Sequence, residues 1–273
     1  MLTWVDGLAV DRIPVGDRGL AYGDGLFETV LVRNGHATLL QQHLERLGAG
    51  CNRLFLPFDA KAVRDELNRF ARAVGEGVIK LTYTRGDGKR GYAAPIPAMP
   101  RRILTSSPLP GYPPSHAEQG IALFPCSTRL AQQPLLAGLK HLNRLEQVLA
   151  RAEWSDERYA EGLMRDAEGY VIEGVFTNLF MIDGDTLITP SLSHCGVEGV
   201  MRSALISASS ACGICCDVRD ISLTTLLAAE EVFVCNSVIG IWPVTEFEGK
   251  QWPVGPVTRK MQALSDRLLG ANA

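Results

Sequence analysis

Residues 26–40 read Leu-Phe-Glu-Thr-Val-Leu-Val-Arg, then Asn-Gly, then His-Ala-Thr-Leu-Leu. The first run is rich in the β-branched and aromatic residues that are common in strands. An Asn-Gly pair between two such runs predicts a two-residue hairpin turn, because both residues tolerate the positive φ that this turn requires. This hairpin is the strongest local signal in the chain.

Helical spacing of apolar residues follows the hairpin, most clearly at Val63, Leu67 and Phe70. We therefore expect helices at about 41–54 and 59–73. Strands are expected at 78–84 and 102–105, on either side of a glycine-rich loop from Gly86 to Gly91.

A proline-rich segment, residues 108–119, holds four of the fifteen prolines. Each proline fixes φ and lacks a backbone donor, so this segment is typical of a linker. We expect a smaller N-terminal α/β domain over 1–107, a linker over 108–119 and a larger C-terminal domain over 120–273. Further elements are expected in the second domain: strands near 120–126, 162–166, 178–182, 186–189 and 231–235, and helices near 142–153, 198–211 and 257–269. The fold class is therefore α/β (α+β), with a sheet order that the pattern leaves open.

Composition excludes several classes of protein. The hydrophobic share of 46% and charged share of 21% are ordinary for a globular enzyme, and a net charge of -3 gives no basic surface for nucleic acid or anionic membranes. The first residues carry no basic segment typical of a signal peptide, and no run approaches the ~18–20 apolar residues of a membrane span. These features predict a cytoplasmic protein with no nucleic-acid or membrane partner.

Seven cysteines form an odd, irregularly spaced set that does not indicate a disulfide framework. Cys212 and Cys215 have CxxC spacing, but no second pair of ligands accompanies them. We therefore expect buried free thiols and no metal site.

Lys140 lies between apolar residues in Leu-Leu-Ala-Gly-Leu-Lys-His-Leu, residues 135–142. Apolar surroundings disfavour the charged ammonium, which frees the amine for Schiff-base chemistry. A lysine whose stem packs on apolar residues at a helix start would give the same local pattern. Two other charged residues stand out: Arg46, whose guanidinium could bind phosphate, and Glu173, a carboxylate between apolar residues that could pair with a pyridinium nitrogen. A surface arginine and a structural ion pair are the alternatives for these two.

Two further stretches could bind a phosphate or a substrate. Residues 196–202 form a glycine-containing loop that leads into an apolar helix, so the amides of Val200 and Met201 would be available at its N-terminus. Asn236 and Ser237 follow a predicted strand and would lie at its end. Each of these signals is weak when taken singly.

Together these stretches resemble the class IV aminotransferase-like family of pyridoxal 5'-phosphate enzymes. The resemblance rests on residues 18–29, Arg-Gly-Leu-Ala-Tyr-Gly-Asp-Gly-Leu-Phe-Glu-Thr, on residues 139–147, Leu-Lys-His-Leu-Asn-Arg-Leu-Glu-Gln, and on Cys-Asn-Ser at 235–237. It implies a two-domain fold of type IV with the cofactor between the domains, and a homodimer. The Lys-His-Leu-Asn-Arg-Leu-Glu-Gln and Arg-Gly-Tyr stretches are most similar to those of the lyases that make 4-aminobenzoate for folate biosynthesis.

The resemblance implies a role for each matching residue. Lys140 would carry the Schiff base, Glu173 would pair with the pyridine nitrogen, and the phosphate would lie against Arg46, the amides of Val200 and Met201, and Ser237. Lys140 would also be the catalytic base, and Thr29 a proton donor to the leaving oxygen. Substrate carboxylates would contact Arg90, Tyr92 and Asn236.

The implied reaction converts 4-amino-4-deoxychorismate to 4-aminobenzoate and pyruvate. A branched-chain or D-amino-acid aminotransferase on the same fold is the alternative, because fold alone does not assign chemistry. A cofactor-binding protein without catalysis is a second alternative, which the presence of Lys140, Arg46 and Glu173 together disfavours. A Rossmann dehydrogenase is excluded, since no GxGxxG opens a helix after a first strand.

Overall fold

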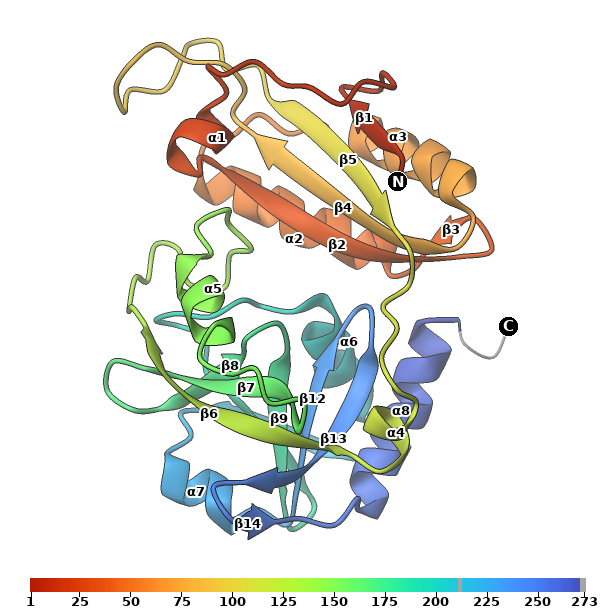
Figure 1. Cartoon of the computed structure of the whole chain (residues 1–273), viewed down its shortest axis with the longest axis vertical. Helices are drawn as coiled ribbons and strands as arrows, with labels where there is room; N and C mark the ends of the chain where they lie inside the picture. The colour runs from red at the N-terminus through yellow and green to blue at the C-terminus, as the bar shows by residue number, and fades with distance from the viewer. Residues whose placement is uncertain (211–212, 271–273) are drawn as a thin grey trace. The chain divides into compact units, whose positions relative to one another are not determined.

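The computed structural model describes residues 1–210 and 213–270, and the chain forms two compact units (Figure 1). Unit 1 contains Met1–Pro110 together with Leu139–Asn143, and unit 2 contains Gly111–Gly138 and Arg144–Ala273. Unit 2 thus begins inside the segment predicted as a linker, and the Lys140 segment belongs to the N-terminal unit. The mixture of helices and sheets confirms the α/β (α+β) class.

Unit 1 is built on an antiparallel sheet. Its strands, in spatial order, are β1 (Thr3–Val5), β5 (Arg101–Ser107), β4 (Gly77–Thr84), β2 (Gly25–Arg33) and β3 (His36–Ala37). The predicted hairpin is confirmed, because β2 pairs with β3 across Asn34 and Gly35, whose φ angles are 50° and 73°. Strand β3 is short because the next helix begins at Leu40.

Three helices accompany this sheet: α1 (Arg18–Tyr22), α2 (Leu40–Arg53) and α3 (Ala60–Val74). The predicted helices at 41–54 and 59–73 are confirmed in α2 and α3, which lie against the same face of the sheet (Figure 1). Side chains alternate between the faces of a strand. Leu26, Glu28 and Val30 of β2 therefore face α2, whereas Phe27 and Thr29 project from the opposite face.

The segment Leu139–Asn143 continues the unit 1 sheet beyond β2. The amide of Phe27 donates to the carbonyl of Lys140 (2.9 Å), and the amide of Leu142 donates to the carbonyl of Gly25 (3.1 Å). The backbone of Lys140 is therefore held by strand-like pairing. This pairing explains why the helix expected at 142–153 begins only at Leu145.

Unit 2 contains a closed ring of strands. They are β6 (Ile121–Leu130), β7 (Tyr159–Asp166), β8 (Val171–Gly174), β9 (Asn178–Asp183), β12 (Glu231–Asn236) and β13 (Gly240–Phe247). The ring closes because β8 pairs with β7 on one side and, through Glu173 and Asn178, with β9 on the other. Buried side chains of these strands, including Leu123, Leu163 and Leu179, form one apolar core. Strands β10 (Thr186–Pro190), β11 (Cys215–Arg219) and β14 (Lys250–Gln251) extend the sheet outside the ring.

The helices of unit 2 are α4 (Ser115–Glu118), α5 (Leu145–Arg151), α6 (Val200–Ser209), α7 (Leu223–Ala228) and α8 (Pro256–Leu268). Helices α6 and α8 pack on β12, and α8 also contacts β13. The predicted helices at 198–211 and 257–269 correspond to α6 and α8, although residue 211 lies outside the described residues. Helix α4 falls within the predicted linker, and β13, which contains Pro243, was not predicted.

Within the described ranges 1–210 and 213–270, no helix is long and apolar enough to cross a membrane. In the same ranges, no group of three or more His, Cys, Asp and Glu side chains is arranged to hold a metal ion. Cys51, Cys126, Cys195 and Cys235 are buried free thiols, as predicted, whereas Cys215 is exposed. Cys212, the other half of the CxxC pair, lies outside the described residues.

Candidate active site

Lys140 lies beside an aromatic ring of unit 1. Its Nζ is 4.4 Å from the centroid of the Phe27 ring, a cation–π distance, and Lys80 Nζ is 5.3 Å from the same centroid. Thr29 is two residues along β2 from Phe27 and pairs in register with Lys80. One face of the sheet therefore presents Lys140, Phe27, Thr29 and Lys80, which brings the two predicted catalytic residues to the same face.

Arg46 forms an ion pair across the opposite face of β2. Its Nε donates to Glu28 Oε1 (2.8 Å), and its Nη2 donates to Glu28 Oε2. His43 Nδ1 also lies 2.6 Å from Glu28 Oε2. Burial would raise the pKa of Glu28, but the charge of Arg46 and the hydrogen bond from His43 outweigh it and lower the pKa to about 2. The Glu28 carboxylate therefore holds the guanidinium, and the role of Arg46 toward a phosphate stays a prediction.

His43 is a buried neutral imidazole. Burial lowers its pKa, an effect that the hydrogen bond to Glu28 only partly offsets. Because Nδ1–H donates to the carboxylate, Nε2 is left as an acceptor, and it has no hydrogen-bond partner among the described residues. The charge of Lys140 also contributes to the lowered pKa of His43. His43 Nε2 is thus a buried acceptor without a donor among the described residues, and Lys140 is one of the charges that act on it. Such an atom suits a site that binds a further group.

Glu173 of unit 2 is a buried carboxylate at the end of β8, with 4% of its surface exposed. Its Oε2 accepts from the amide of Val197 (2.9 Å) and from Asn178 Nδ2 (3.4 Å). Asn178 Nδ2 also donates to the carbonyl of Val197 (2.9 Å). These two donors fix the orientation of the Glu173 carboxylate, and its pairing with a pyridine nitrogen stays a prediction. Sequence patterns did not reveal Asn178, whose role depends on the β8–β9 pairing.

Helix α6 begins at Val200 after Gly199, and no side chain caps its first turn. The first amides of a helix lack partners within the helix, so those of Val200 and Met201 suit an anion. A Cβ on Gly199 would lie 1.9 Å from Asn178 Oδ1, so a larger residue there would displace the Asn178 side chain. The loop before α6 thus packs against the same asparagine that contacts Glu173.

Asn236 and Ser237 follow β12, as predicted. Asn236 Oδ1 accepts from the amides of Val238 and Ile239, and its Nδ2 donates to the carbonyl of Phe176 (3.2 Å). The side chain of Asn236 therefore organises the local turn. Its predicted contact with substrate stays a prediction, as does the phosphate contact of the buried Ser237.

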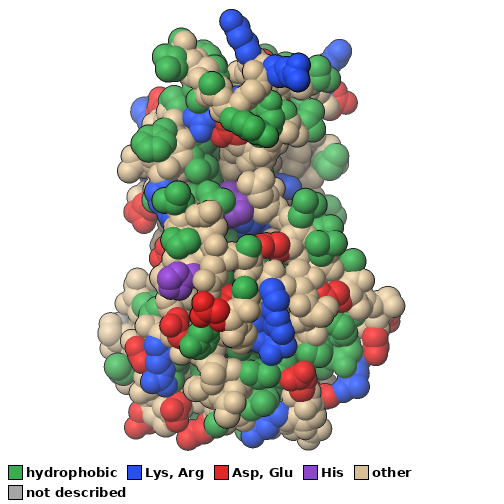
Figure 2. All heavy atoms as spheres, turned by 90° about the vertical axis from the view of Figure 1, so that its left-hand side faces the viewer, with side chains coloured by type: hydrophobic (Ala, Val, Ile, Leu, Met, Phe, Trp, Pro, Cys, Tyr) green, Lys and Arg blue, Asp and Glu red, His purple; other side chains and the backbone are tan. Residues whose placement is uncertain are grey.

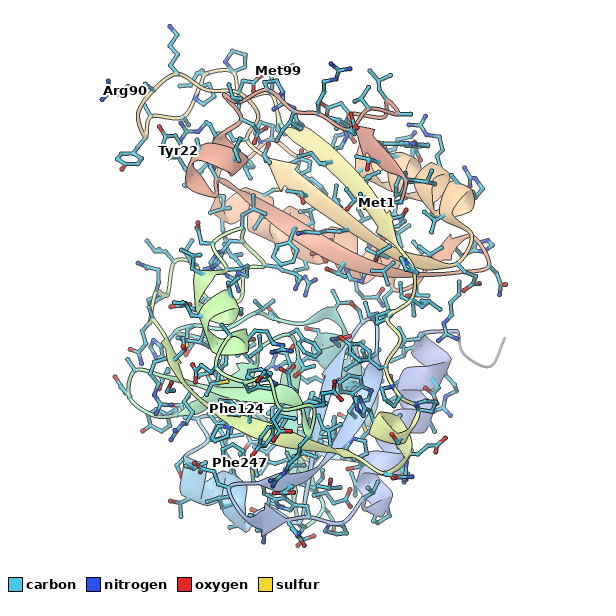
Figure 3. The ribbon with its side chains drawn as sticks, in the orientation of Figure 1. Met1, Tyr22, Arg90, Met99, Phe124 and Phe247 are labelled. Carbon is cyan, nitrogen blue, oxygen red and sulfur yellow. The ribbon has the colours of Figure 1, made fainter. Side chains whose placement is uncertain are left out.

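Arg90 and Tyr92 lie on the loop between β4 and β5 of unit 1, and Tyr92 is 87% exposed. Figure 3 shows Arg90 at the outer edge of this loop. The predicted site residues thus fall into two sets. Unit 1 holds Lys140, Thr29, Arg46, Arg90 and Tyr92, and unit 2 holds Glu173, Val200, Met201, Asn236 and Ser237.

Glu161 is a fully buried carboxylate that sequence patterns missed. It accepts from the amides of Gly162 (2.8 Å), Val175 (3.0 Å) and Phe176 (3.2 Å) and from Thr177 Oγ1 (2.8 Å). These bonds fix the turn that joins Glu173 to Asn178. Burial raises the pKa of Glu161 to about 7 in spite of the four donors.

Three comparisons place the chain among known proteins. The Amino-transferase class IV family model matches residues 25–247. The chain is 37% identical to aminodeoxychorismate lyase of Vibrio harveyi, over 95% of this chain and 97% of that protein. It superimposes on the crystal structure of 4-amino-4-deoxychorismate lyase from Pseudomonas aeruginosa with a TM-score of 0.96 and 56% identity, over 97% of this chain and 98% of that one. Branched-chain amino acid aminotransferase of Escherichia coli is more distant, with a TM-score of 0.84 and 25% identity over 96% of this chain and 92% of that one.

Proposed function

Because the chain belongs to the aminotransferase class IV family, we propose that it is a pyridoxal-phosphate lyase that converts 4-amino-4-deoxychorismate to 4-aminobenzoate and pyruvate. The observation that carries the proposal is the likeness to the Pseudomonas aeruginosa lyase, 56% identical over 97% of this chain. A putative branched-chain aminotransferase of Methanocaldococcus jannaschii and the Escherichia coli enzyme match at 28% and 25% identity, which supports a common ancestor more than a common reaction.

The residues present fit the cofactor. Lys140 would hold it covalently, Glu173 would hold a proton on its ring nitrogen, and Arg46 and Ser237 would bind its phosphate together with the first amides of α6. The unsatisfied His43 Nε2 and the uncapped start of α6 are the observations that support a bound group. Pyridoxal phosphate, when bound, supplies an aldehyde for an amine and a ring that withdraws electrons from the adjacent carbon.

Two residues on one face of the unit 1 sheet would perform the proton transfers. The amine of Lys140 removes the proton from the substrate carbon that carries the amino group. Thr29, on the same face, gives a proton to the enolpyruvyl oxygen as that group leaves the neighbouring carbon. Arg90 and Tyr92 hold a substrate carboxylate, and Asn236 is the third proposed substrate contact. Loss of the enolpyruvyl group completes an aromatic ring, which drives the reaction forward.

We also propose that the enzyme is a cytoplasmic homodimer. Helix α5 supports the dimer, because Leu145, Val148 and Leu149 share one side of it and are 76%, 61% and 60% exposed. Figure 2 views the side of the molecule on which α5 lies in Figure 1 and shows hydrophobic side chains at its surface. The buried free thiols are consistent with a reducing compartment. Light scattering should give twice the mass of one chain.

Product analysis tests the function. Purified protein incubated with 4-amino-4-deoxychorismate should release 4-aminobenzoate and pyruvate in equal amounts, and Lys140→Ala should release neither. A parallel incubation with an amino acid and 2-oxoglutarate should yield no keto acid from the amino acid. Keto-acid formation without 4-aminobenzoate would instead assign the aminotransferase reaction.

A further inference from the structure

Arg18 is a buried arginine whose guanidinium binds a loop. The residue begins α1 and is 4% exposed. Its Nη1 donates to the carbonyls of Gly91 (2.9 Å) and Ala93 (3.3 Å), and its Nη2 donates to the carbonyl of Tyr92 (3.1 Å). Three consecutive carbonyls, at 91, 92 and 93, therefore converge on one side chain that lies more than seventy residues earlier in the chain.

Asp24 fixes the other edge of this guanidinium. Its Oδ2 accepts from Arg18 Nε (2.8 Å) and from Arg85 Nε (2.7 Å). Arg85 in turn donates to the carbonyls of Leu54 and Phe55. Burial would raise the pKa of Asp24, but the hydrogen bonds from Arg85 and Arg18 lower it below the usual value. The carboxylate is therefore charged at neutral pH and anchors both arginines.

The loop makes further contacts with the same helix. The amide of Gly91 donates to Tyr22 Oη (3.1 Å), and the rings of Tyr22 and Tyr92 lie 5.5 Å apart. A Cβ on Gly88 would lie 2.6 Å from Arg18 Cδ and 2.9 Å from Cγ. The middle of the arginine side chain thus packs directly on the loop backbone. The labelled Tyr22 and Arg90 in Figure 3 locate this helix and this loop.

We propose that Arg18 is a positioning residue that fixes the backbone of Gly91–Ala93 and thereby places Arg90 and Tyr92 to bind a substrate carboxylate. The inference rests on the proposed function, since it concerns the loop that would recognise the substrate. Arg18 itself has no role toward the cofactor. Its guanidinium is occupied by the loop carbonyls and by Asp24.

Arginine is required because of the number and direction of its donors. A guanidinium carries five N–H donors in a planar fork, and four of them are needed for the carbonyls of residues 91–93 and for Asp24. A lysine keeps the charge but has three donors on a single atom, so it cannot bind this set together. Removal of bonds from a charged donor to three carbonyls would release the loop from α1.

The experiment compares Arg18→Lys with the wild type in the cofactor-loaded enzyme. The Michaelis constant for 4-amino-4-deoxychorismate should rise about tenfold or more, while kcat changes less than about threefold and cofactor absorbance is unchanged. Brief trypsin digestion of the native protein should cut the loop after Lys89 or Arg90 several times faster, as measured by mass spectrometry of the N-terminal fragment. Gly88→Ala displaces Arg18 without removing it, so it should also raise the Michaelis constant and the rate of cleavage in the loop.

Arg12→Gln is the matched control, because Arg12 is exposed in the same N-terminal segment and no side-chain hydrogen bond of Arg12 is present among the described residues. It should leave the Michaelis constant and the cleavage rate unchanged. In an Arg90→Gln background, Arg18→Lys should raise the Michaelis constant by a smaller factor than it does in the wild type, because both changes act through the same loop. An unchanged Michaelis constant or an unchanged cleavage rate in Arg18→Lys overturns the inference. If wild-type protein makes no 4-aminobenzoate, the proposed function fails, whereas the cleavage rate still decides whether Arg18 holds the loop.

Discussion

Glu161 makes the stability of unit 2 depend on pH in a direction that can be calculated. Its pKa rises from 4.5 to about 7 because burial disfavours the charged carboxylate. A carboxyl group whose pKa is higher in the folded state than in the unfolded state stabilises the fold at pH values below its unfolded-state pKa. This stabilisation is lost as the pH rises through the folded-state pKa. One pKa unit corresponds to about 1.4 kcal/mol, so the wild type should lose about 3 kcal/mol from this group between pH 4.5 and pH 8.

Glu161→Gln removes this dependence, because an amide stays neutral throughout. The amide oxygen can still accept from the amides of Gly162 and Val175, but its NH₂ group would face the Phe176 amide, which loses its acceptor. A lost hydrogen bond of this kind costs about 1–3 kcal/mol. The variant should therefore be less stable than the wild type near pH 5. Between pH 5 and pH 8 the free energy of unfolding of the variant should then rise by about 3 kcal/mol relative to that of the wild type.

Thermal unfolding at pH 5, 6, 7 and 8 measures this change. For a protein of this size, 1 kcal/mol shifts Tm by about 2–4 °C, so the gap between variant and wild type should change by roughly 6–12 °C. Glu157→Gln is the control, because Glu157 is an exposed carboxylate just before β7, the strand that contains Glu161. The difference in Tm between this variant and the wild type should be the same at every pH. A gap for Glu161→Gln that does not vary with pH would refute the assignment of a raised pKa to this buried carboxylate.

Three further predictions concern the proposed chemistry. Lys140→Ala should lose the visible absorbance of the bound cofactor and nearly all turnover, and a fully active variant would remove Lys140 from its role. Glu173→Gln should keep much of the cofactor binding but sharply lower kcat. Arg46→Ala should instead raise the cofactor concentration that is needed for half-maximal activity. Identical behaviour of the two variants in a cofactor titration would show that the roles of Glu173 and Arg46 are wrongly divided. Thr29→Val should slow 4-aminobenzoate formation by about 10²–10⁴-fold in single-turnover assays while the absorbance change on substrate binding is kept, and an unchanged rate would exclude Thr29 as the proton donor.

Local patterns predicted the elements whose signals are contained in a few residues. The Asn34-Gly35 turn and the helices α2 and α3 follow from turn chemistry and from apolar spacing, and the structure has them within a few residues. The closed ring of unit 2 could not be predicted, because it depends on the pairing of β8 with both β7 and β9. Strand β13 was missed because it contains a proline. Pro243 argues against a strand in the sequence, yet here it sits opposite Phe233 in a buried antiparallel pair.

The candidate site divides in the same way. Lys140, Glu173 and Arg46 could be singled out because their residue types and neighbours match a family pattern. The ion pair of Arg46 with Glu28 could not, since it depends on which face of β2 packs on α2. Asn178, Glu161 and Arg18 act through hydrogen bonds to distant backbone, and no sequence pattern marks such contacts. The proposed ligand-binding residues could therefore be selected from the sequence, whereas the residues that hydrogen-bond to the surrounding backbone could not.

The face of β2 that carries Phe27 bears on the choice between elimination and transamination. An elimination requires a base at one carbon and a proton donor near the oxygen that leaves the next carbon, whereas transamination requires no such donor. Lys140 Nζ lies over the Phe27 ring. The Cα atom of Thr29 lies two residues along β2 from that of Phe27, about 7 Å away in strand geometry. The proposed reaction requires the amine of Lys140 and the hydroxyl of Thr29 to reach one six-membered ring from this face. Under the proposed mechanism the hydroxyl of Thr29 is the proton donor on this face, whereas an aminotransferase on the same fold would have no use for it.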